Sequence, residues 1–251
     1  MAEPVLRVLP GPTEVAAEAA AEVAARAGEA VAARGAFMLA LSGGSTPRAL
    51  YALLADPSGA LAARMPWGRT QVFFGDERHV PPGHPDSNFR MAREALLARV
   101  PIPAENVHRI RGELPDAAEA AAAYERELRA VLGEVPALDL VLLGLGEDGH
   151  TASLFPGSPA LDERERWVAA PWVERIGAFR ITLTLPVLDR ARAVVFLVAG
   201  AEKAAALRRA LRGAAEGEPV PAARVRPLGG RLLWLADRAA AASLGTESEP
   251  R

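Results

Sequence analysis

The sequence contains no cysteine, a single lysine and no marked excess of either charge. Without cysteine the chain has neither a disulfide framework nor a thiolate that could act as nucleophile or metal ligand. Its 251 residues include 29 basic and 31 acidic side chains, which give a formal net charge of −2. This balance provides no broad positive field, so neither nucleic acid nor an anionic membrane surface is an expected partner.

Long apolar runs are also absent. No segment approaches the roughly 20 apolar residues that cross a bilayer, and residues 1–4 lack the start of a signal peptide, so a cytoplasmic location is expected. Hydrophobic residues make up 50% and charged residues 24% of the chain, which is typical of a globular protein. We expect one α/β domain over residues 1–244, a disordered tail at 245–251, and a monomer with a weak dimer as the alternative.

Short apolar runs alternate with longer helical stretches along the chain. The runs at 36–41, 138–143 and 194–198 are continuous, as in strands that are buried on both faces. The alternation predicts a three-layer αβα fold with a mainly parallel sheet and a possible small lobe, whose functional sites lie at the carboxyl ends of the strands. Other predicted strands are 71–74, 167–169, 180–185 and 231–235, and predicted helices are 13–34, 87–99, 116–132 and 202–211.

A glycine-rich turn at residues 42–47 follows the first continuous strand and leads into another helix, with Thr46 as predicted N-cap and Pro47 as first helical residue. Such a turn can present backbone N–H groups, hydroxyls and a positive helix end to an anion. Because it lacks the Gly-Lys-Ser/Thr ending of a nucleotide loop, a monophosphate is favoured, and a plain tight turn is the alternative. The residues of this phosphate turn are Gly43, Gly44, Ser45 and Thr46.

Ionisable residues follow the predicted strand at 71–74. Asp76 and Arg78 flank Glu77, and His79 comes next. At the end of a buried strand these side chains could support acid–base chemistry or hold a polar substrate. Taken alone, the segment is better explained as the start of a solvated loop.

The histidines of this region do not indicate a metal centre. His79, His84 and Asp86 are separated by prolines and a glycine, in a spacing unlike that of known ligand sets. No metal is expected.

Residues 144–149 match the Gly-x-Gly-x-x-Gly fingerprint of dinucleotide-binding proteins, but their surroundings differ. The last glycine of that fingerprint opens a long helix, whereas the chain soon reaches Pro156 and Gly157. The acidic residue expected about 20 positions later, after a second strand, is also missing. No nicotinamide cofactor is expected.

The same loop places His150 at the end of a predicted strand. Free histidine has a pKa of about 6.5, which suits removal of a proton from water near neutral pH. Gly146, Asp148 and Gly149 would support the loop around it. Position alone leaves a catalytic base and a structural histidine equally open.

Lys203, the only lysine, follows the strand predicted at 194–198 and lies in the first turn of the next predicted helix. An ammonium group there could help to bind a phosphate dianion. A common lysine would be explained as a solvated helix residue. Because arginine is used everywhere else, Lys203 is a candidate phosphate ligand.

Five segments, in order along the chain, together resemble the 6-phosphogluconolactonase family. The resemblance spans about residues 12 to 240 and implies hydrolysis of 6-phospho-D-glucono-1,5-lactone, without a cofactor, in the oxidative pentose phosphate pathway. It also implies a Rossmann-like sheet shared with glucosamine-6-phosphate deaminases and ribose-5-phosphate isomerases. The segments are 41–47, 75–78, 86–88, 144–157 and 200–203.

The resemblance implies roles for individual residues. His150 would deprotonate the water that attacks the lactone carbonyl and then return the proton to the ring oxygen. The phosphate turn and Lys203 would bind the 6-phosphate, with Arg180 as a further helper. Asp76 and Arg78 would line the sugar end of the pocket. Beyond the resemblance, we infer that Arg78 helps to stabilise the oxyanion or the product carboxylate and that Asp76 orients a substrate hydroxyl or His150.

Two alternatives are a glucosamine-6-phosphate deaminase and a non-catalytic sugar-phosphate sensor. Deaminases resemble this chain at the phosphate turn and at residues 148–150, but a glutamate assists their histidine where Phe155 stands here. They also tend to have a tyrosine where this chain has Arg78. Sensors of this fold normally carry a DNA-binding helix-turn-helix, for which the sequence offers no spare segment.

Overall fold

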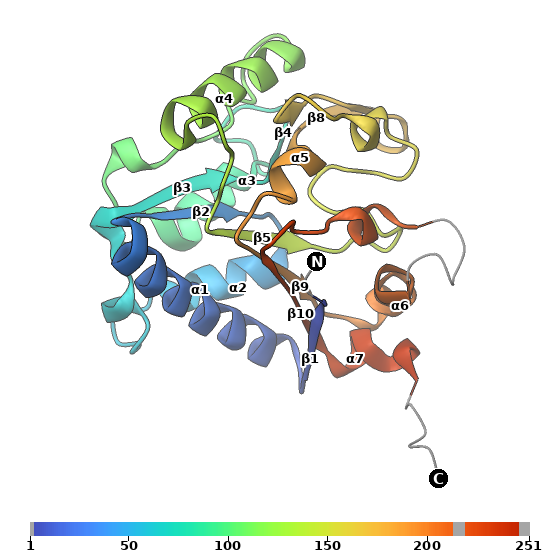
Figure 1. The fold of residues 1–251 in the computed structure, drawn as a ribbon, viewed down its shortest axis with the longest axis horizontal. Coiled ribbons are helices and arrows are strands. Elements are labelled where there is room, and N and C mark those ends of the chain that lie inside the picture. The colour runs from blue at the N-terminus through green and yellow to red at the C-terminus, as the bar shows by residue number, and fades with distance from the viewer. Residues whose placement is uncertain (1–2, 213–218, 246–251) are drawn as a thin grey trace.

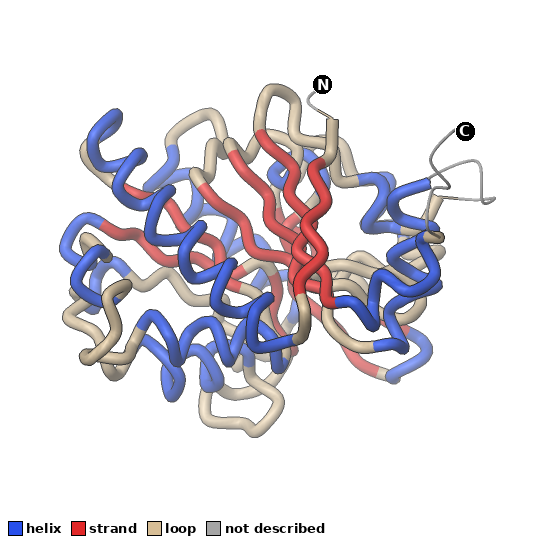
Figure 2. Tube along the Cα trace, turned by 90° about the horizontal axis from the view of Figure 1, so that it is seen from below, coloured by secondary structure: helices blue, strands red, loops and turns tan. Residues whose placement is uncertain are grey.

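A six-stranded parallel sheet forms the centre of the computed structural model, which describes residues 3–212 and 219–245. Its strand order is β1-β10-β9-β5-β2-β3, and every neighbouring pair is parallel. Figure 2 shows these strands side by side with helices around them. The strands are β1 (Val5–Leu9), β2 (Phe37–Leu41), β3 (Thr70–Phe74), β5 (Leu140–Gly144), β9 (Ala193–Val198) and β10 (Arg231–Asp237).

Helices cover both faces of this sheet. Helices α1 (Pro12–Arg34) and α2 (Ser45–Leu54) lie together on one side, and α4 (Ala117–Leu132) and α5 (Leu185–Leu188) lie on the other (Figure 1). Three further helices are α3 (Asn88–Ala92), α6 (Ala204–Arg212) and α7 (Arg238–Ala241). No described helix has both the length and the apolarity that a bilayer crossing requires.

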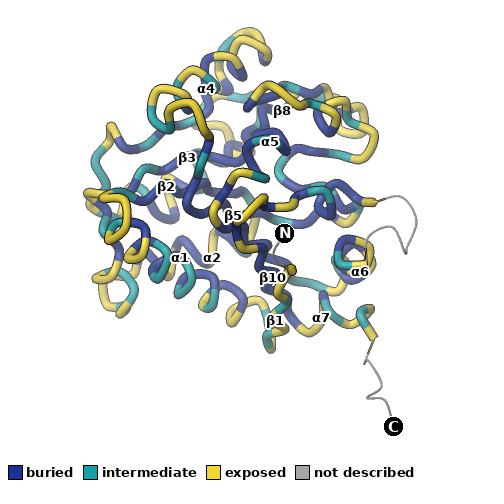
Figure 3. Tube along the Cα trace, viewed as in Figure 1, coloured by how far each residue is buried: buried dark blue, intermediate teal, exposed yellow. Residues whose placement is uncertain are grey.

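Helix α1 packs on the sheet through a face of small side chains. This face is buried, whereas the opposite side of the helix is exposed (Figure 3). Alanine and valine at helical spacing allow the backbone of α1 to lie close to β2, β9 and β10. The buried residues of the face are Val15, Ala16, Ala19, Ala20, Val23, Ala24, Ala27 and Ala30.

A second, smaller sheet is antiparallel and stands beside the first. Its order is β4 (Asp76–Arg78), β8 (Ala178–Leu183) and β6 (Val168–Ala169), and β7 (Trp172–Val173) also pairs with β8. Helix α4 packs against β6 and β8. The predicted α/β fold with a mainly parallel sheet is thus confirmed, and the small sheet forms its minor part.

Several predicted boundaries are wrong. Residues 76–78, expected in a loop, form β4, and the helix expected at 87–99 divides into α3 and a π-helical turn at Arg93–Leu97. Strand β1 escapes prediction because it is an edge strand with exposed valines and no continuous apolar run. The tail predicted to be disordered at 245–251 lies outside the described residues except for Gly245.

Charged side chains close the amino-terminal end of the sheet. Asp139, directly before β5, is buried, and its Oδ2 accepts a hydrogen bond of 2.9 Å from Met38 N. Its Oδ1 lies 2.8 Å from Arg34 Nη2 and 3.3 Å from Arg192 Nε. One carboxylate therefore links α1, β2, β5 and the start of β9.

We predict that Asp139→Ala lowers the free energy of unfolding by about 1–3 kcal/mol, because it leaves the Met38 amide and two guanidinium groups without this acceptor. Urea unfolding would measure the change. Glu119→Ala, which removes an exposed carboxylate from α4, should stay within about 0.5 kcal/mol of the parent protein. Equal stability of the two variants would show that the cluster contributes nothing.

Candidate active site

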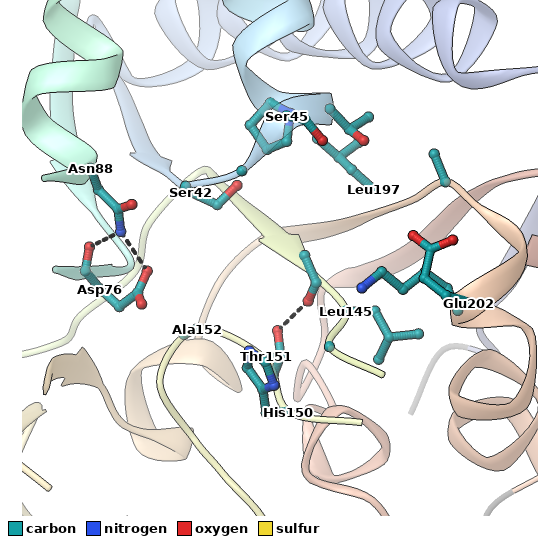
Figure 4. Close-up of a pocket in the computed structure, with 18 of the residues that line it drawn as sticks. Ser42, Ser45, Asp76, Asn88, Leu145, His150, Thr151, Ala152, Leu197 and Glu202 are labelled. Carbon is teal, nitrogen blue, oxygen red and sulfur yellow. Dashed lines mark hydrogen bonds between the residues drawn. The ribbon is translucent and has the colours of Figure 1, made fainter. Parts of the chain in front are cut away.

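A cavity of about 330 Å³ opens at the carboxyl ends of the central strands. Figure 4 shows the residues that β2, β4, β5 and β9 and the loops after them contribute to it. Its lining combines the phosphate turn, Ser42, Asp76, Arg78, Asn88, Gly146, His150, Ala152, Glu202 and Lys203, among others.

The phosphate turn and Lys203 line the same cavity. The prediction of Thr46 as N-cap is wrong, because α2 begins at Ser45 and its N-cap is Gly44, with a positive φ of 113°. No side chain caps α2, so the hydroxyls of Ser45 and Thr46 remain available to a ligand at this helix end. Lys203 ends a 3₁₀ turn directly before α6, with Nζ 3.9 Å from Glu147 Oε1.

Gly43 allows a side chain from α3 to reach the site. A Cβ atom at this position would lie 2.1 Å from Oδ1 of Asn88. The amide of Asn88 donates to the backbone oxygen of Asp76 at 3.0 Å and to its Oδ1 at 3.2 Å. Asn88 is a site residue that the sequence pattern did not single out, although it ends one of the segments that carry the family resemblance.

Asp76 is buried on β4 and is held by two donors. Ser153 Oγ donates to its Oδ2 at 2.6 Å, and Asn88 donates to its Oδ1. These bonds fix the carboxylate at the cavity wall. The carboxylate bonded to His150 is that of Asp148, so the suggestion that Asp76 orients the histidine gains no support.

Arg78 and Arg180 lie side by side. They are directly opposed in the antiparallel register of β4 and β8, and Arg78 donates to the backbone oxygen of Asp86. Burial lowers the pKa of Arg180, and the charge of Arg78 lowers it further. Of these two arginines, Arg78 lines the cavity, whereas its described lining does not include Arg180, so the suggested help of Arg180 in phosphate binding gains no support.

His150 is held by its neighbour two residues earlier. Its Nδ1 lies 2.5 Å from Asp148 Oδ1, which also accepts the backbone N–H of His150 at 3.1 Å. A carboxylate only accepts, so Nδ1 carries a proton, and in the neutral ring Nε2 has the lone pair. Burial raises the pKa of Asp148, but hydrogen bonds from His150 and the charges of His150 and Arg175 outweigh it and lower that pKa overall.

Packing sets the plane of the imidazole. The ring of His150 stacks on that of Phe155, with centroids 4.3 Å apart and planes at 23°. On another side is Gly146, where a Cβ atom would lie 1.9 Å from Nδ1 of His150. Gly149 has a φ of 84° and faces Val220 so closely that a Cβ would lie 2.5 Å from it. A side chain at either glycine would therefore collide with its neighbours in this loop.

Two tyrosines complete the backbone hydrogen bonds at the strand ends. The hydroxyl of Tyr51 accepts from Ser42 N at 3.0 Å and donates to Ser42 O at 2.8 Å. Tyr124 does the same for Phe74, at 2.8 and 3.0 Å. Burial raises the pKa of both hydroxyls well above the usual range, so they remain donors. Gly43 and Gly75, which lead into the site, follow these bonded residues directly.

Glu77 anchors the start of α3. Its buried carboxylate accepts hydrogen bonds from the backbone N–H groups of Arg78, Asn88 and Phe89 and from Ser87 Oγ, at 2.7 to 2.9 Å. Burial raises its pKa even though all four bonds lower it. Glu77 thereby holds Asn88 at the cavity.

Within the described ranges, no three His, Asp or Glu side chains form a group that could hold a metal ion.

Comparison with known proteins places the chain in a family. The family model described as glucosamine-6-phosphate isomerases/6-phosphogluconolactonase matches residues 10–234. A 6-phosphogluconolactonase of Nostoc sp. is 44% identical over 243 residues, covering 95% of this chain and 98% of the relative. The chain belongs to the glucosamine-6-phosphate isomerase/6-phosphogluconolactonase family, which confirms the resemblance seen in its motifs.

Two more relatives come from Homo sapiens and Trypanosoma brucei. The 6-phosphogluconolactonase of Homo sapiens is 46% identical over 213 residues, covering 82% of this chain and 80% of the relative. The solved structure of the 6-phosphogluconolactonase from Trypanosoma brucei superposes with a TM-score of 0.85 at 33% identity, covering 97% of this chain and 99% of that one. The similarity therefore extends over the whole described fold.

We predict that Gly146→Ala displaces the imidazole of His150 and breaks its bond to Asp148, because the new methyl group would overlap Nδ1. Crystal structures of the variant and the parent would show the ring position. Gly28→Ala is the matched control, since a Cβ there meets no atom within 4 Å and the site lies elsewhere. An unmoved ring in the Gly146 variant would contradict the packing described above.

Proposed function

We propose that this protein hydrolyses 6-phospho-D-glucono-1,5-lactone to 6-phosphogluconate, as the 6-phosphogluconolactonases it resembles are named to do. The observation that carries the proposal is the Asp148–His150 pair in a cavity that the phosphate turn also lines. The reaction would stand in the oxidative pentose phosphate pathway. Since segments from Ser42 to Lys203 of one chain line the cavity, we infer that a monomer with a single domain holds a complete site.

His150 would act as the general base. Its Nε2 takes a proton from water while the water oxygen bonds to the lactone carbonyl carbon. As the tetrahedral intermediate collapses, the bond from that carbon to the ring oxygen breaks, and the imidazolium returns the proton to this oxygen. Asp148 fixes the tautomer and stabilises the imidazolium that forms between the two steps.

The opposite end of the substrate would bind at the phosphate turn. The N–H groups at the start of α2 and the hydroxyls of Ser45 and Thr46 suit a phosphate dianion, and Lys203 supplies a full positive charge. Ser42 Oγ is buried, lines the cavity and has no hydrogen-bond partner among the described residues, so it offers a further donor.

Arg78 would bind the reacting end. Developing negative charge on the carbonyl oxygen needs a donor at the cavity wall, and a guanidinium supplies both charge and direction. Arg180, beside it, would add to the local positive potential, which suits the carboxylate of the product. Asp76, fixed by Ser153 and Asn88, would accept a hydrogen bond from a sugar hydroxyl.

Deamination of glucosamine-6-phosphate is the second candidate function, since the family includes such enzymes. Phe155 speaks against it, because an aromatic ring stacks on His150 where a deaminase has its assisting glutamate.

The expected result is that the purified protein accelerates lactone hydrolysis without added metal, and that His150→Ala removes most of this acceleration, on the order of 100-fold or more. Glucose-6-phosphate dehydrogenase would generate the lactone and 6-phosphogluconate dehydrogenase would report its hydrolysis, with the spontaneous rate subtracted. Calorimetry should show that the variant still binds 6-phosphogluconate. Ammonia release from glucosamine-6-phosphate without lactone turnover would favour the deaminase, and full activity of His150→Ala would remove the base assignment.

For Lys203→Ala we expect a raised KM, on the order of 10-fold, with a smaller change in kcat, because a phosphate remote from the reacting carbon mainly supplies binding. The same assay measures both constants. Arg209→Ala removes an exposed cation from α6 and should leave KM unchanged. If KM stays constant in the lysine variant, Lys203 is not a phosphate ligand.

A further inference from the structure

The hairpin of the small sheet brings an arginine to the catalytic loop. Strand β7 leads into a 3₁₀ turn at Glu174–Ile176, and Gly177, with a φ of 56°, reverses the chain into β8. From this turn Arg175 reaches the loop that follows β5, where its Nη2 lies 3.2 Å from Asp148 Oδ2. The other oxygen of the same carboxylate binds His150.

Arg175 also contacts the ring on which His150 stacks. Its guanidinium carbon lies 5.6 Å from the centroid of Phe155, within the range of a cation–π contact. Four side chains therefore form a closed series of contacts: Arg175 to Asp148, Asp148 to His150, His150 to Phe155, and Phe155 back to Arg175. The carboxylate of Asp148 contacts one edge of the imidazole, and the ring of Phe155 packs on one face. The guanidinium of Arg175 contacts both of these groups.

We propose that Arg175 is a positioning residue for His150, which orients Asp148 and Phe155 around the imidazole and balances the negative charge of Asp148. This inference rests on the proposed function, in which His150 is the base. Arg175 was not a candidate in the sequence, since nothing in residues 172–179 suggests contact with residues 148–155.

Charge balance matters because a base must be unprotonated before it can react. A carboxylate bonded to an imidazole favours the protonated imidazolium, and a nearby cation disfavours it. With Arg175 on its second oxygen, Asp148 can still orient Nδ1 of His150 and stabilise the imidazolium during the reaction. The positive charge of Arg175 reduces the tendency of Asp148 to keep His150 protonated before the reaction begins.

Other ionisable groups surround the pair. Across the cavity His150 faces Asp76 and Arg78 from β4 and Glu202 and Lys203 from the turn before α6, and Glu147 lies in its own loop. The ammonium of Lys203 pairs with Glu147 rather than with Asp148. Arg175 is thus the cation in direct contact with Asp148 in the described part of the chain.

Exposure limits the size of the effect. The side chain of Arg175 is 61% exposed, so solvent and salt screen its charge. We therefore expect a shift of about half a pH unit rather than several units when the charge is removed. The shift should also shrink as ionic strength rises.

The test is the pH dependence of kcat/KM for Arg175→Ala, Arg175→Lys and Phe155→Leu in the coupled lactonase assay, together with the NMR titration of the His150 ring. Loss of the cation makes His150 protonate at a higher pH. The acid limb should therefore move upward by about 0.5 unit in Arg175→Ala, a loss of about threefold at low pH. Arg175→Lys keeps the charge and should restore the midpoint. Phe155→Leu should lower kcat while the midpoint stays.

Arg109→Ala is the matched control. Arg109 also pairs with a carboxylate, that of Glu113, and lies 5.6 Å from a phenylalanine centroid, but it does so away from the cavity. Its loss should leave the midpoint of the acid limb of kcat/KM and the midpoint of the His150 ring titration unchanged.

Two outcomes overturn the inference. One is an Arg175→Ala variant that titrates like Arg109→Ala, which would make the ion pair a surface contact, and the other is an Arg175→Lys variant that behaves like the alanine. The ring titration is independent of turnover. Failure of the lactonase proposal, seen as no acceleration of lactone hydrolysis by the parent protein, is therefore distinguishable from failure of this one.

Discussion

Hydrogen bonding by two buried tyrosines at the ends of neighbouring strands is the constraint on which the site depends. Ser42 lies just beyond the ladder between β2 and β5, and Phe74 lies on β3, the edge strand of the sheet, so the buried N–H and C=O groups of these two residues need partners from outside the sheet. Tyr51 and Tyr124 each supply one hydroxyl that serves as acceptor and donor for a single residue. The chain can therefore turn out of the sheet at Ser42 and shortly after Phe74, and Gly43 and Asp76, which follow, line one cavity.

Continuous apolar runs made the central sheet predictable, because β2, β5 and β9 are buried on both faces and their sequences show it. The hydrophobic pattern of the sequence does not predict a strand whose buried residues are charged. In β4, Asp76 and Glu77 are charged and yet buried, since hydrogen bonds from Ser153, Asn88 and other groups satisfy them. These hydrogen bonds come from residues that are distant in the sequence, so the local periodicity of the sequence cannot predict them.

The candidate site was predictable to the extent that it is local. The glycines, the histidine and the aspartate of the catalytic loop are close in sequence, so their proximity in space could be predicted. The Asp148–His150 bond spans only two residues. Asn88, Ser153 and Arg175 reach the site from other elements, and their positions follow from strand order and register. Family motifs pointed to the segments that contain two of them, but the role of each side chain needed its neighbours in space.

Glu77 has a consequence for the balance between stability and activity. Because burial raises its pKa, the folded protein binds this proton more readily than the unfolded chain, and the stability contributed by Glu77 decreases as the pH rises from its ordinary pKa through the raised value. At neutral pH the ionised group is therefore less favourable in the folded protein than in the unfolded chain. A neutral replacement could relieve that penalty, but an amide side chain could not accept four hydrogen bonds in the same places. The buried, ionised Glu77 therefore lowers the stability of the folded protein, and in return its four hydrogen bonds keep the cavity wall rigid.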